Sequence, residues 1–144
     1  MSLVRHLLEK KGSDVATIGE KATVLEAAGK MNERRIGCLV VVDGDKIKGI
    51  FTERDILCRV VAARRDPATT RVAEVMTSKV AVCSPNSTVE SCRAAMSRNK
   101  MRHLPVVDGD RLVGMLSSGD ILSRELADQE ETIRWLHEYM HGPN

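Results

Sequence analysis

The chain has 144 residues, of which 42% are apolar and 29% charged, as is typical of a soluble globular protein with one domain or two small ones. A net charge of +2 without a clustered basic excess, and only one Phe, one Trp and one Tyr, disfavour nucleic-acid binding. No apolar run approaches the ~20 residues of a membrane span, and the first residues have no signal-peptide pattern. We therefore expect a cytoplasmic protein with no membrane partner, whose four cysteines are reduced thiols.

An internal repeat is the strongest feature of the sequence. Residues 23–57 align without a gap on residues 88–122 at an offset of 65, and 13 of the 35 aligned positions are identical. The pentapeptide Val-Val-Asp-Gly-Asp occurs at 41–45 and again at 106–110. Chance does not produce this similarity over an ungapped span, so the chain contains a duplication.

Each repeat predicts the order strand–helix–strand–strand–helix. In the first repeat we expect a strand over 15–18, a helix capped by Thr23 and Glu26, a hairpin over 38–51 with an Asp-Gly turn, and a helix from about residue 53. In the second repeat we expect a strand over 80–83, a helix capped by Ser87 and Glu90, a hairpin with the same turn, and a helix from about Ser118. Cys83 and Cys92 fall on the apolar faces and are predicted to be core thiols.

The two repeats are joined by an exposed connection around Pro67, and a further helix follows Arg124 and ends at Gly142-Pro143. The expected division is repeat 1 over 1–65, a linker over 66–72, repeat 2 over 73–125 and a C-terminal helix or tail over 126–144. This last helix holds two of the three aromatic residues, so we expect it to pack on a second subunit, the alternative being its own module.

One repeat alone leaves a face of its sheet uncovered. Two repeats packed face to face bury that surface, which predicts an α+β fold with pseudo-two-fold symmetry, two equivalent clefts and a C-terminal helix.

The segment Leu-Pro-Val-Val-Asp-Gly at 104–109, followed by Gly and then Ser/Thr-x-x-Asp, resembles the tandem CBS domain, or Bateman module. Both copies carry the second part of this pattern, at 49–55 and at 114–120. The resemblance covers about residues 12–125 and implies a stand-alone pair of β-α-β-β-α repeats. It further implies a non-catalytic regulatory or energy-sensing module that forms a homodimer and acts on a regulated protein. The implied ligand is an adenine nucleotide, AMP first, with ADP, ATP, NAD(H) or S-adenosylmethionine as alternatives.

The same resemblance implies which residues bind the nucleotide. Asp120 and Asp55 would hold the ribose, because one carboxylate can accept hydrogen bonds from two neighbouring hydroxyls. Ser117 and Thr52 would contact phosphate at a helix N-terminus. Helix capping by these four residues is the alternative reading, and the two roles are compatible.

Arg102 and His103 are implied phosphate contacts, whereas the first repeat has Gly37 and Cys38 at these positions. The cleft at Asp120 is therefore the stronger candidate. Cys38, which aligns with His103, is expected to line a cleft. Adenine would lie along strand segments borrowed from the opposite repeat. The residues expected there are Lys11, Val15, Ala16 and Gly37 at the Asp120 cleft, and Lys79, Val80 and Ala81, within the segment 77–81, at the Asp55 cleft.

Three other functions stay open from the residues. They are a ligand-free structural dimerisation module, a partner of a redox system acting through an exposed Cys38 or Cys58, and a metal-binding protein. His137 and His141 share a helix face, but the sequence offers no third ligand. A hydrolase triad of Ser117, His103 and Asp120 is disfavoured because the G-x-S-x-G elbow is absent, and we expect no enzyme.

Overall fold

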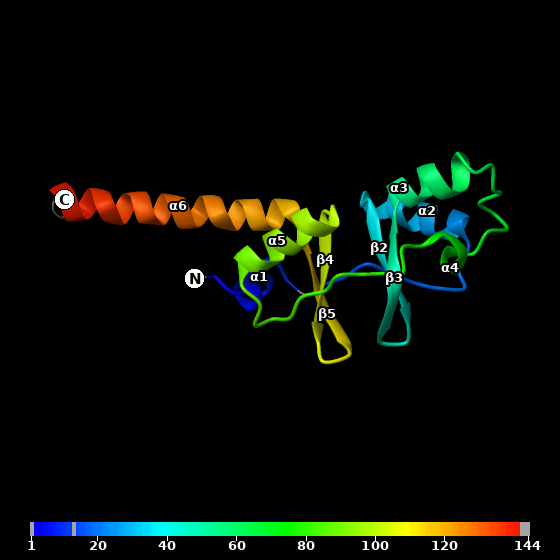
Figure 1. Cartoon of the computed structure of the whole chain (residues 1–144), viewed down its shortest axis with the longest axis horizontal. Helices are drawn as coiled ribbons and strands as arrows, with labels where there is room; N and C mark the ends of the chain where they lie inside the picture. Colours follow the sequence, from blue (N-terminus) through cyan, green and yellow to red (C-terminus); the bar gives the residue numbers. More distant parts are fainter. Residues whose placement is uncertain (1, 13, 142–144) are drawn as a thin grey trace.

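A computed structural model of the chain describes residues 2–12 and 14–141 (Figure 1). The element order is α1 (Val4–Lys11), β1 (Thr17–Gly19), α2 (Val24–Arg34), β2 (Cys38–Asp43), β3 (Lys46–Thr52), α3 (Glu53–Asp55), the π-helical η1 (Ile56–Val61), α4 (Val72–Val75), α5 (Val89–Asn99), β4 (His103–Asp108), β5 (Arg111–Ser117) and α6 (Ser118–His141). The mixed architecture of two repeats and a C-terminal helix is confirmed.

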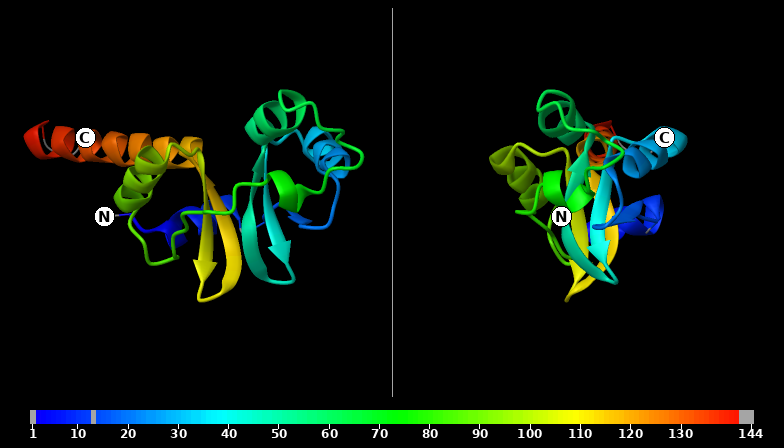
Figure 2. Two further views of the ribbon diagram at one scale, coloured as in Figure 1. Left: turned by 45° about the vertical axis from the view of Figure 1, so that its right-hand side comes forward. Right: turned by 90° about the vertical axis from the view of Figure 1, so that its right-hand side faces the viewer.

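The two β-hairpins lie side by side in the middle of the molecule, and the helices lie outside them (Figures 1 and 2). In the first repeat the strand order is β1-β2-β3, with β1 parallel to β2 and β2 antiparallel to β3. In the second repeat β4 and β5 form an antiparallel pair, and each hairpin has an irregularity at the same position.

The strand expected over 80–83 is reduced to a single bridge between Cys83 and Val106, so this prediction was too long. The reason is Pro105, which occupies the position of Val40 in the first repeat. The Val40 N–H donates to the carbonyl of Ala16 at 3.1 Å and so extends the ladder beyond β1. Proline has no N–H, so the corresponding bond to Ala81 cannot form.

The caps follow the prediction in one repeat only. The Thr23 hydroxyl accepts from the Glu26 N–H at 3.1 Å, as expected. In the second repeat the predicted Ser87 cap is wrong, because the Ser87 hydroxyl accepts from the Ser84 N–H at 3.0 Å within the preceding turn. Thr88 caps α5 instead, accepting from the Ser91 N–H at 3.1 Å.

The last two predicted helices are one. α6 runs unbroken for 24 residues from Ser118, so no helix ends at Glu125. The intervening residues are good helix formers with no Gly or Pro, so nothing ends the helix there. The predicted end at Gly142-Pro143 lies outside the described residues.

Each repeat contributes a short helix to the hydrophobic core of the other repeat: α1 enters the second core and α4 enters the first. Val4 and Leu7 of α1 are buried in the core of the second repeat, together with Leu104 and Leu116. The mirror arrangement places α4 in the core of the first repeat. The Val4 N–H donates to the Ser87 carbonyl at 2.9 Å, and the Val72 N–H donates to the Ala22 carbonyl at 2.8 Å. The two cores therefore do not follow the chain order, while the expected division at 65, 72 and 125 stays a prediction.

Candidate functional site

The strongest candidate site lies where β5 ends and α6 begins. The Ser117 N–H donates to Asp120 Oδ2 at 2.8 Å, and the Asp120 N–H donates to Ser117 Oγ at 3.1 Å. This reciprocal pair caps α6, so the capping role expected for both residues is present. It also fixes the Asp120 carboxylate at a helix N-terminus, beside the end of α1.

Lys11, the last residue of α1, forms an ion pair with the Asp120 carboxylate, although the two residues lie far apart in the sequence. Its Nζ lies 2.5 Å from Asp120 Oδ2 and donates to the Met115 carbonyl at 2.7 Å. Partial burial opposes the charge of Asp120, but the hydrogen bonds from Lys11 and Ser117 outweigh it, so the pKa of Asp120 lies below its ordinary value. Among the described residues, every hydrogen bond that the chain gives this carboxylate falls on Oδ2.

His103 begins β4 directly opposite Ser117 in the strand register. Burial lowers the pKa of His103, and the charges of Lys11 and Arg102 lower it further, while the carboxylates of Asp120 and Glu53 act in the opposite direction. The imidazole is therefore neutral near pH 7 and is surrounded by groups of both signs. The structure thus brings Lys11 and Ser117 into contact with Asp120 and places His103 beside them. Arg102 is exposed and acts on His103 through its charge, and the binding role expected of these residues stays a prediction.

Glu53 is a site residue that the sequence reasoning missed. It begins α3 in the first repeat, yet its charge acts on His103 of the second. Gly37 lies against it, since a Cβ at Gly37 would sit 3.0 Å from the Glu53 carboxyl group. The available signal was its alignment with Ser118, since Glu53 places a charge where the second repeat has a neutral side chain.

The corresponding site at Asp55 is closed by the protein itself. Thr52 and Asp55 form the same reciprocal cap, with the Thr52 N–H 3.0 Å from Asp55 Oδ2. The Thr77 hydroxyl donates to Asp55 Oδ1 at 3.2 Å, and Arg59 lies 3.8 Å from the same oxygen. The Asp55 residue is only 7% exposed. Both of its carboxylate oxygens are therefore in use.

Thr77 comes from the segment expected to serve this cleft. Further along that segment, Val80 and Ala81 are half-buried and Lys79 is exposed. On the other side, Val15 lines a cavity of about 250 Å³ near the hairpin ends, together with Thr17, Val42, Gly44, Asp45 and Leu112. The cavity thus joins residues of both repeats.

The cysteines are free thiols in different environments. Burial, and then the charge of Asp55, raise the pKa of Cys38 to about 12. A hydrogen bond with Cys92 and burial raise the pKa of Cys83, and both of these thiols lie in the second core as predicted. Cys58 is exposed. A redox role through an exposed Cys38 is therefore not available.

Within residues 2–12 and 14–141 the structure offers neither a membrane span nor a metal cluster. No helix there combines the length and the apolarity needed to cross a membrane. No group of three or more His, Cys, Asp or Glu side chains is placed there to hold a metal ion.

Comparison with known proteins identifies the family. The model of the CBS domain matches residues 4–62 and 72–127. The chain is 34% identical over 117 residues to the CBS domain-containing protein YhcV of Bacillus subtilis, covering 81% of this chain and 83% of that protein. It is 32% identical over 108 residues to hypoxic response protein 1 of Mycobacterium tuberculosis, covering 74% of this chain and 76% of that protein.

Solved structures similar to this chain are also CBS-domain proteins. A putative signal-transduction protein with CBS domains from Burkholderia ambifaria superposes with a TM-score of 0.83 at 41% identity, over 89% of this chain and 96% of that one. A CBS domain protein from Pyrobaculum aerophilum, complexed with AMP, superposes with a TM-score of 0.74 at 28% identity, over 83% of this chain and 89% of that one. The chain belongs to the CBS-domain family, as a pair of CBS repeats of the regulatory kind.

Proposed function

We propose that this CBS pair is a non-catalytic sensor that binds an adenine nucleotide at Asp120. AMP is the first candidate, with ADP, ATP, NAD(H) and S-adenosylmethionine as the alternatives to test beside it. The observation that carries the proposal is the Asp120 carboxylate: it is held in place through Oδ2, and no described residue of the chain hydrogen-bonds to Oδ1. A fixed carboxylate with an oxygen to spare suits the paired hydroxyls of a ribose.

The difference between the two repeats supports a single main site. At Asp55 the position of the ligand hydroxyl is taken by Thr77, and the carboxylate is buried. At Asp120 the side chain is 27% exposed. A nucleotide therefore finds an accessible carboxylate in the second repeat and a satisfied one in the first.

The charges around Asp120 support a phosphorylated ligand. Lys11 and Arg102 are cations, and His103 becomes one when it binds a proton. Charge-assisted hydrogen bonds to phosphate are stronger than neutral ones. Glu53 also acts on His103 and repels phosphate, so a monophosphate, which carries fewer negative charges, fits this charge distribution better than a long polyphosphate.

The relatives support both ligand and assembly. The Pyrobaculum protein is an AMP complex, and a CBS-CP12 protein from cyanobacteria, similar over 97% of this chain at 28% identity with a TM-score of 0.73, is described as hexameric. We infer that the present chain also self-associates in the cytoplasm, and that nucleotide binding changes its contact with a regulated protein. Such a change requires unequal nucleotide affinity for two states of the assembly.

The test is thermal unfolding with each of the five ligands, for the wild type and for two matched variants, Asp120→Asn and Asp55→Asn. Asparagine keeps an oxygen for the helix cap but removes the charge. A ligand at 100 times its Kd stabilises the native state by about 2.7 kcal/mol, which raises Tm by several degrees. We expect a shift with AMP that Asp120→Asn abolishes and Asp55→Asn retains.

Two other outcomes would contradict the proposal. Loss of the shift in Asp55→Asn alone would place the ligand in the first repeat and contradict the single-site proposal. No shift with any of the five compounds would instead favour a ligand-free dimerisation module, with both aspartates acting only as helix caps.

A further inference from the structure

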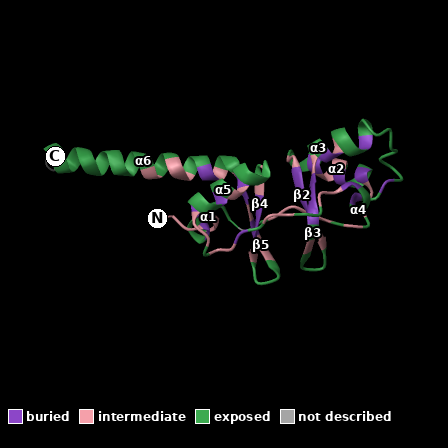
Figure 3. Ribbon diagram, viewed as in Figure 1, coloured by how far each residue is buried: buried purple, intermediate pink, exposed green. Residues whose placement is uncertain are grey.

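The C-terminal half of α6 projects beyond the two repeats as the structure describes them. Figure 1 shows the helix extending away from both repeats, and Figure 3 shows that its outer part is exposed on every side. Every described residue from Gln129 onward is exposed. An isolated helix of this length is marginal in water, because tertiary packing normally supplies most of its stability.

The exposed apolar residues of α6 follow a heptad pattern. Leu122, Leu126, Ile133, Leu136 and Met140, with Gln129 between them, are spaced alternately by four and three residues. We call these six residues the seam. Leu126, Ile133 and Met140 take the a positions and the other three take the d positions. Ile133 and Met140 are 66% and 74% exposed, so the seam is uncovered along the outer part of the helix.

We propose that the seam pairs with the seam of a second copy, in a parallel two-stranded coiled coil. Isoleucine at a followed by leucine at d, as at Ile133 and Leu136, favours two parallel strands. In this register each residue meets its own counterpart, so the two Gln129 amides, which are both donors and acceptors, can hydrogen-bond to each other. A shift of register would bury each amide against an apolar side chain without a hydrogen-bond partner, which costs free energy, so this polar layer favours the aligned register. The proposal specifies the surface of the self-association proposed above and does not depend on nucleotide binding.

The charges beside the seam are compatible with a second copy. In the parallel register Glu125 of one copy faces Glu130 of the other. Glu125 is already paired with Arg93, whose Nε lies 3.1 Å away, so the contact includes a cation rather than two bare carboxylates. Asp128 is likewise paired with Arg124 at 3.3 Å. The remaining acidic side chains at 131 and 138 lie on the opposite side of the helix from the seam.

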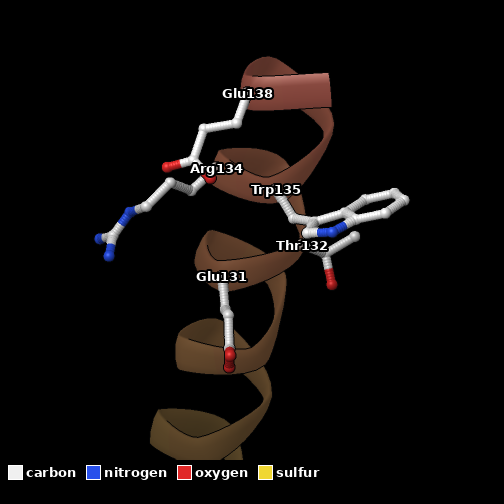
Figure 4. A pocket seen from close by; sticks show the side chains of 5 residues that line it. All are labelled: Glu131, Thr132, Arg134, Trp135 and Glu138. Atoms are coloured by element: carbon white, nitrogen blue, oxygen red, sulfur yellow. The ribbon is translucent and has the colours of Figure 1, made fainter. Parts of the chain in front are cut away.

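Another side of α6 carries the aromatic residues Trp135 and Tyr139. Figure 4 shows Trp135 and Thr132 on one side of the helix and Arg134 and Glu138 on the other. With Glu131 these residues border a shallow space of about 450 Å³ formed by this one helix. Trp135 stacks on Tyr139 with ring centroids 5.6 Å apart. This aromatic pair already has an intrachain contact and lies outside the seam.

The test is the molar mass in solution by light scattering for three proteins: the wild type, a seam variant Ile133→Lys/Leu136→Lys, and a control Glu131→Lys/Glu138→Lys on the opposite face. All four positions are exposed, so the repeats should fold in each protein, which circular dichroism and Tm will verify. We expect the seam variant to have half the mass of the wild type, and the control to match the wild type. A monomeric wild type would overturn self-association itself. An oligomeric wild type with an unchanged seam variant would overturn the seam alone.

The orientation is tested by a single cysteine. Leu136→Cys is placed in a Cys58→Ser background, where the other three native thiols are buried. In the parallel register the two introduced thiols face each other, so mild oxidation should give a covalent dimer on a non-reducing gel. In an antiparallel pair they would be far apart, and an oligomer without this crosslink would overturn the parallel arrangement.

Discussion

The imidazole of His103 is half-buried between two cations, Lys11 and Arg102, and two carboxylates, Asp120 and Glu53. Burial dominates, so the pKa of His103 is lowered relative to the unfolded chain. The unfolded state then binds the proton first as the pH falls, and this residue reduces stability below about pH 6.5. The same neutral imidazole is ready to take up a proton when an anion arrives.

Nucleotide binding should therefore depend on pH through His103. A phosphate group raises the pKa of His103, so binding takes up a proton and the affinity increases as the pH falls from about 8 to 6, by up to about tenfold per unit for one full proton. Calorimetric titration at several pH values measures the slope. His103→Gln should flatten it, apart from the part due to the titration of the phosphate itself. Equal slopes for both proteins would exclude this role of His103.

Part of this site could be predicted from the sequence. Asp120, Ser117 and His103 were found because the repeat and the family pattern mark their positions, and Lys11 followed from the expected exchange of strand segments. Glu53 was not found, because its effect on His103 depends on how closely the two repeats pack. The closure of the Asp55 site also depends on packing, since the Thr77 hydroxyl reaches Asp55 across 22 positions of sequence.

At the scale of elements, each hairpin has a glycine at the equivalent position, and the two glycines have different neighbours. A Cβ on Gly49 of β3 would lie 2.6 Å from the Thr77 carbonyl oxygen, which is backbone. A Cβ on Gly114 of β5 would lie 2.7 Å from a terminal methyl group of Leu8, which can rotate. The two glycines thus let the exchanged segments approach each sheet. The first approach is rigid and the second is adjustable.

We expect Gly49→Ala to destabilise the protein by about 1–3 kcal/mol and Gly114→Ala to have a clearly smaller effect. Gly29→Ala is the control: it lies on an exposed face of α2 with nothing within 4 Å, and should stabilise the helix by about 0.5–1 kcal/mol. Urea unfolding measures all three variants. Equal costs at Gly49 and Gly114 would show that the Thr77 backbone yields as easily as the Leu8 side chain.

The type and order of the secondary-structure elements were more predictable than their boundaries. The helices and hairpins follow from apolar periodicity and the Asp-Gly turns, and the weak strand at 80–83 could have been anticipated from Pro105. The continuation of α6 past Arg124 has a local signal, the lack of Gly or Pro. The π-helical winding of η1 has no signal in residues 56–61 that we can identify.

At the scale of the whole molecule, the exchange of α1 and α4 ties the two repeats together. The sequence shows an apolar spacing at Val4 and Leu7, but it cannot show which core these residues enter, because both cores are built from equivalent positions. The structure places them in the second repeat and places Val72 and Val75 in the first. Neither core is complete without a segment that precedes the other repeat in the chain.

This arrangement predicts one cooperative unfolding transition rather than two. Leu7→Ala removes a side chain that is 6% exposed and should cost about 2–5 kcal/mol. Because unfolding of the second core releases α1, and α4 precedes that same repeat, the loss should lower the transition of the entire molecule. Glu9→Ala, on the exposed face of α1, should change stability by less than about 0.5 kcal/mol.

Differential scanning calorimetry checks this, since a single transition has equal calorimetric and van't Hoff enthalpies. We expect that equality for the wild type and for both variants, with a lower Tm only in Leu7→Ala. Two resolved peaks, of which Leu7→Ala moves only one, would mean that the repeats unfold independently despite the exchange. The nucleotide site would then report on the second repeat alone. A single peak instead would mean that a nucleotide bound at Asp120, beside Lys11 of α1, stabilises both cores together.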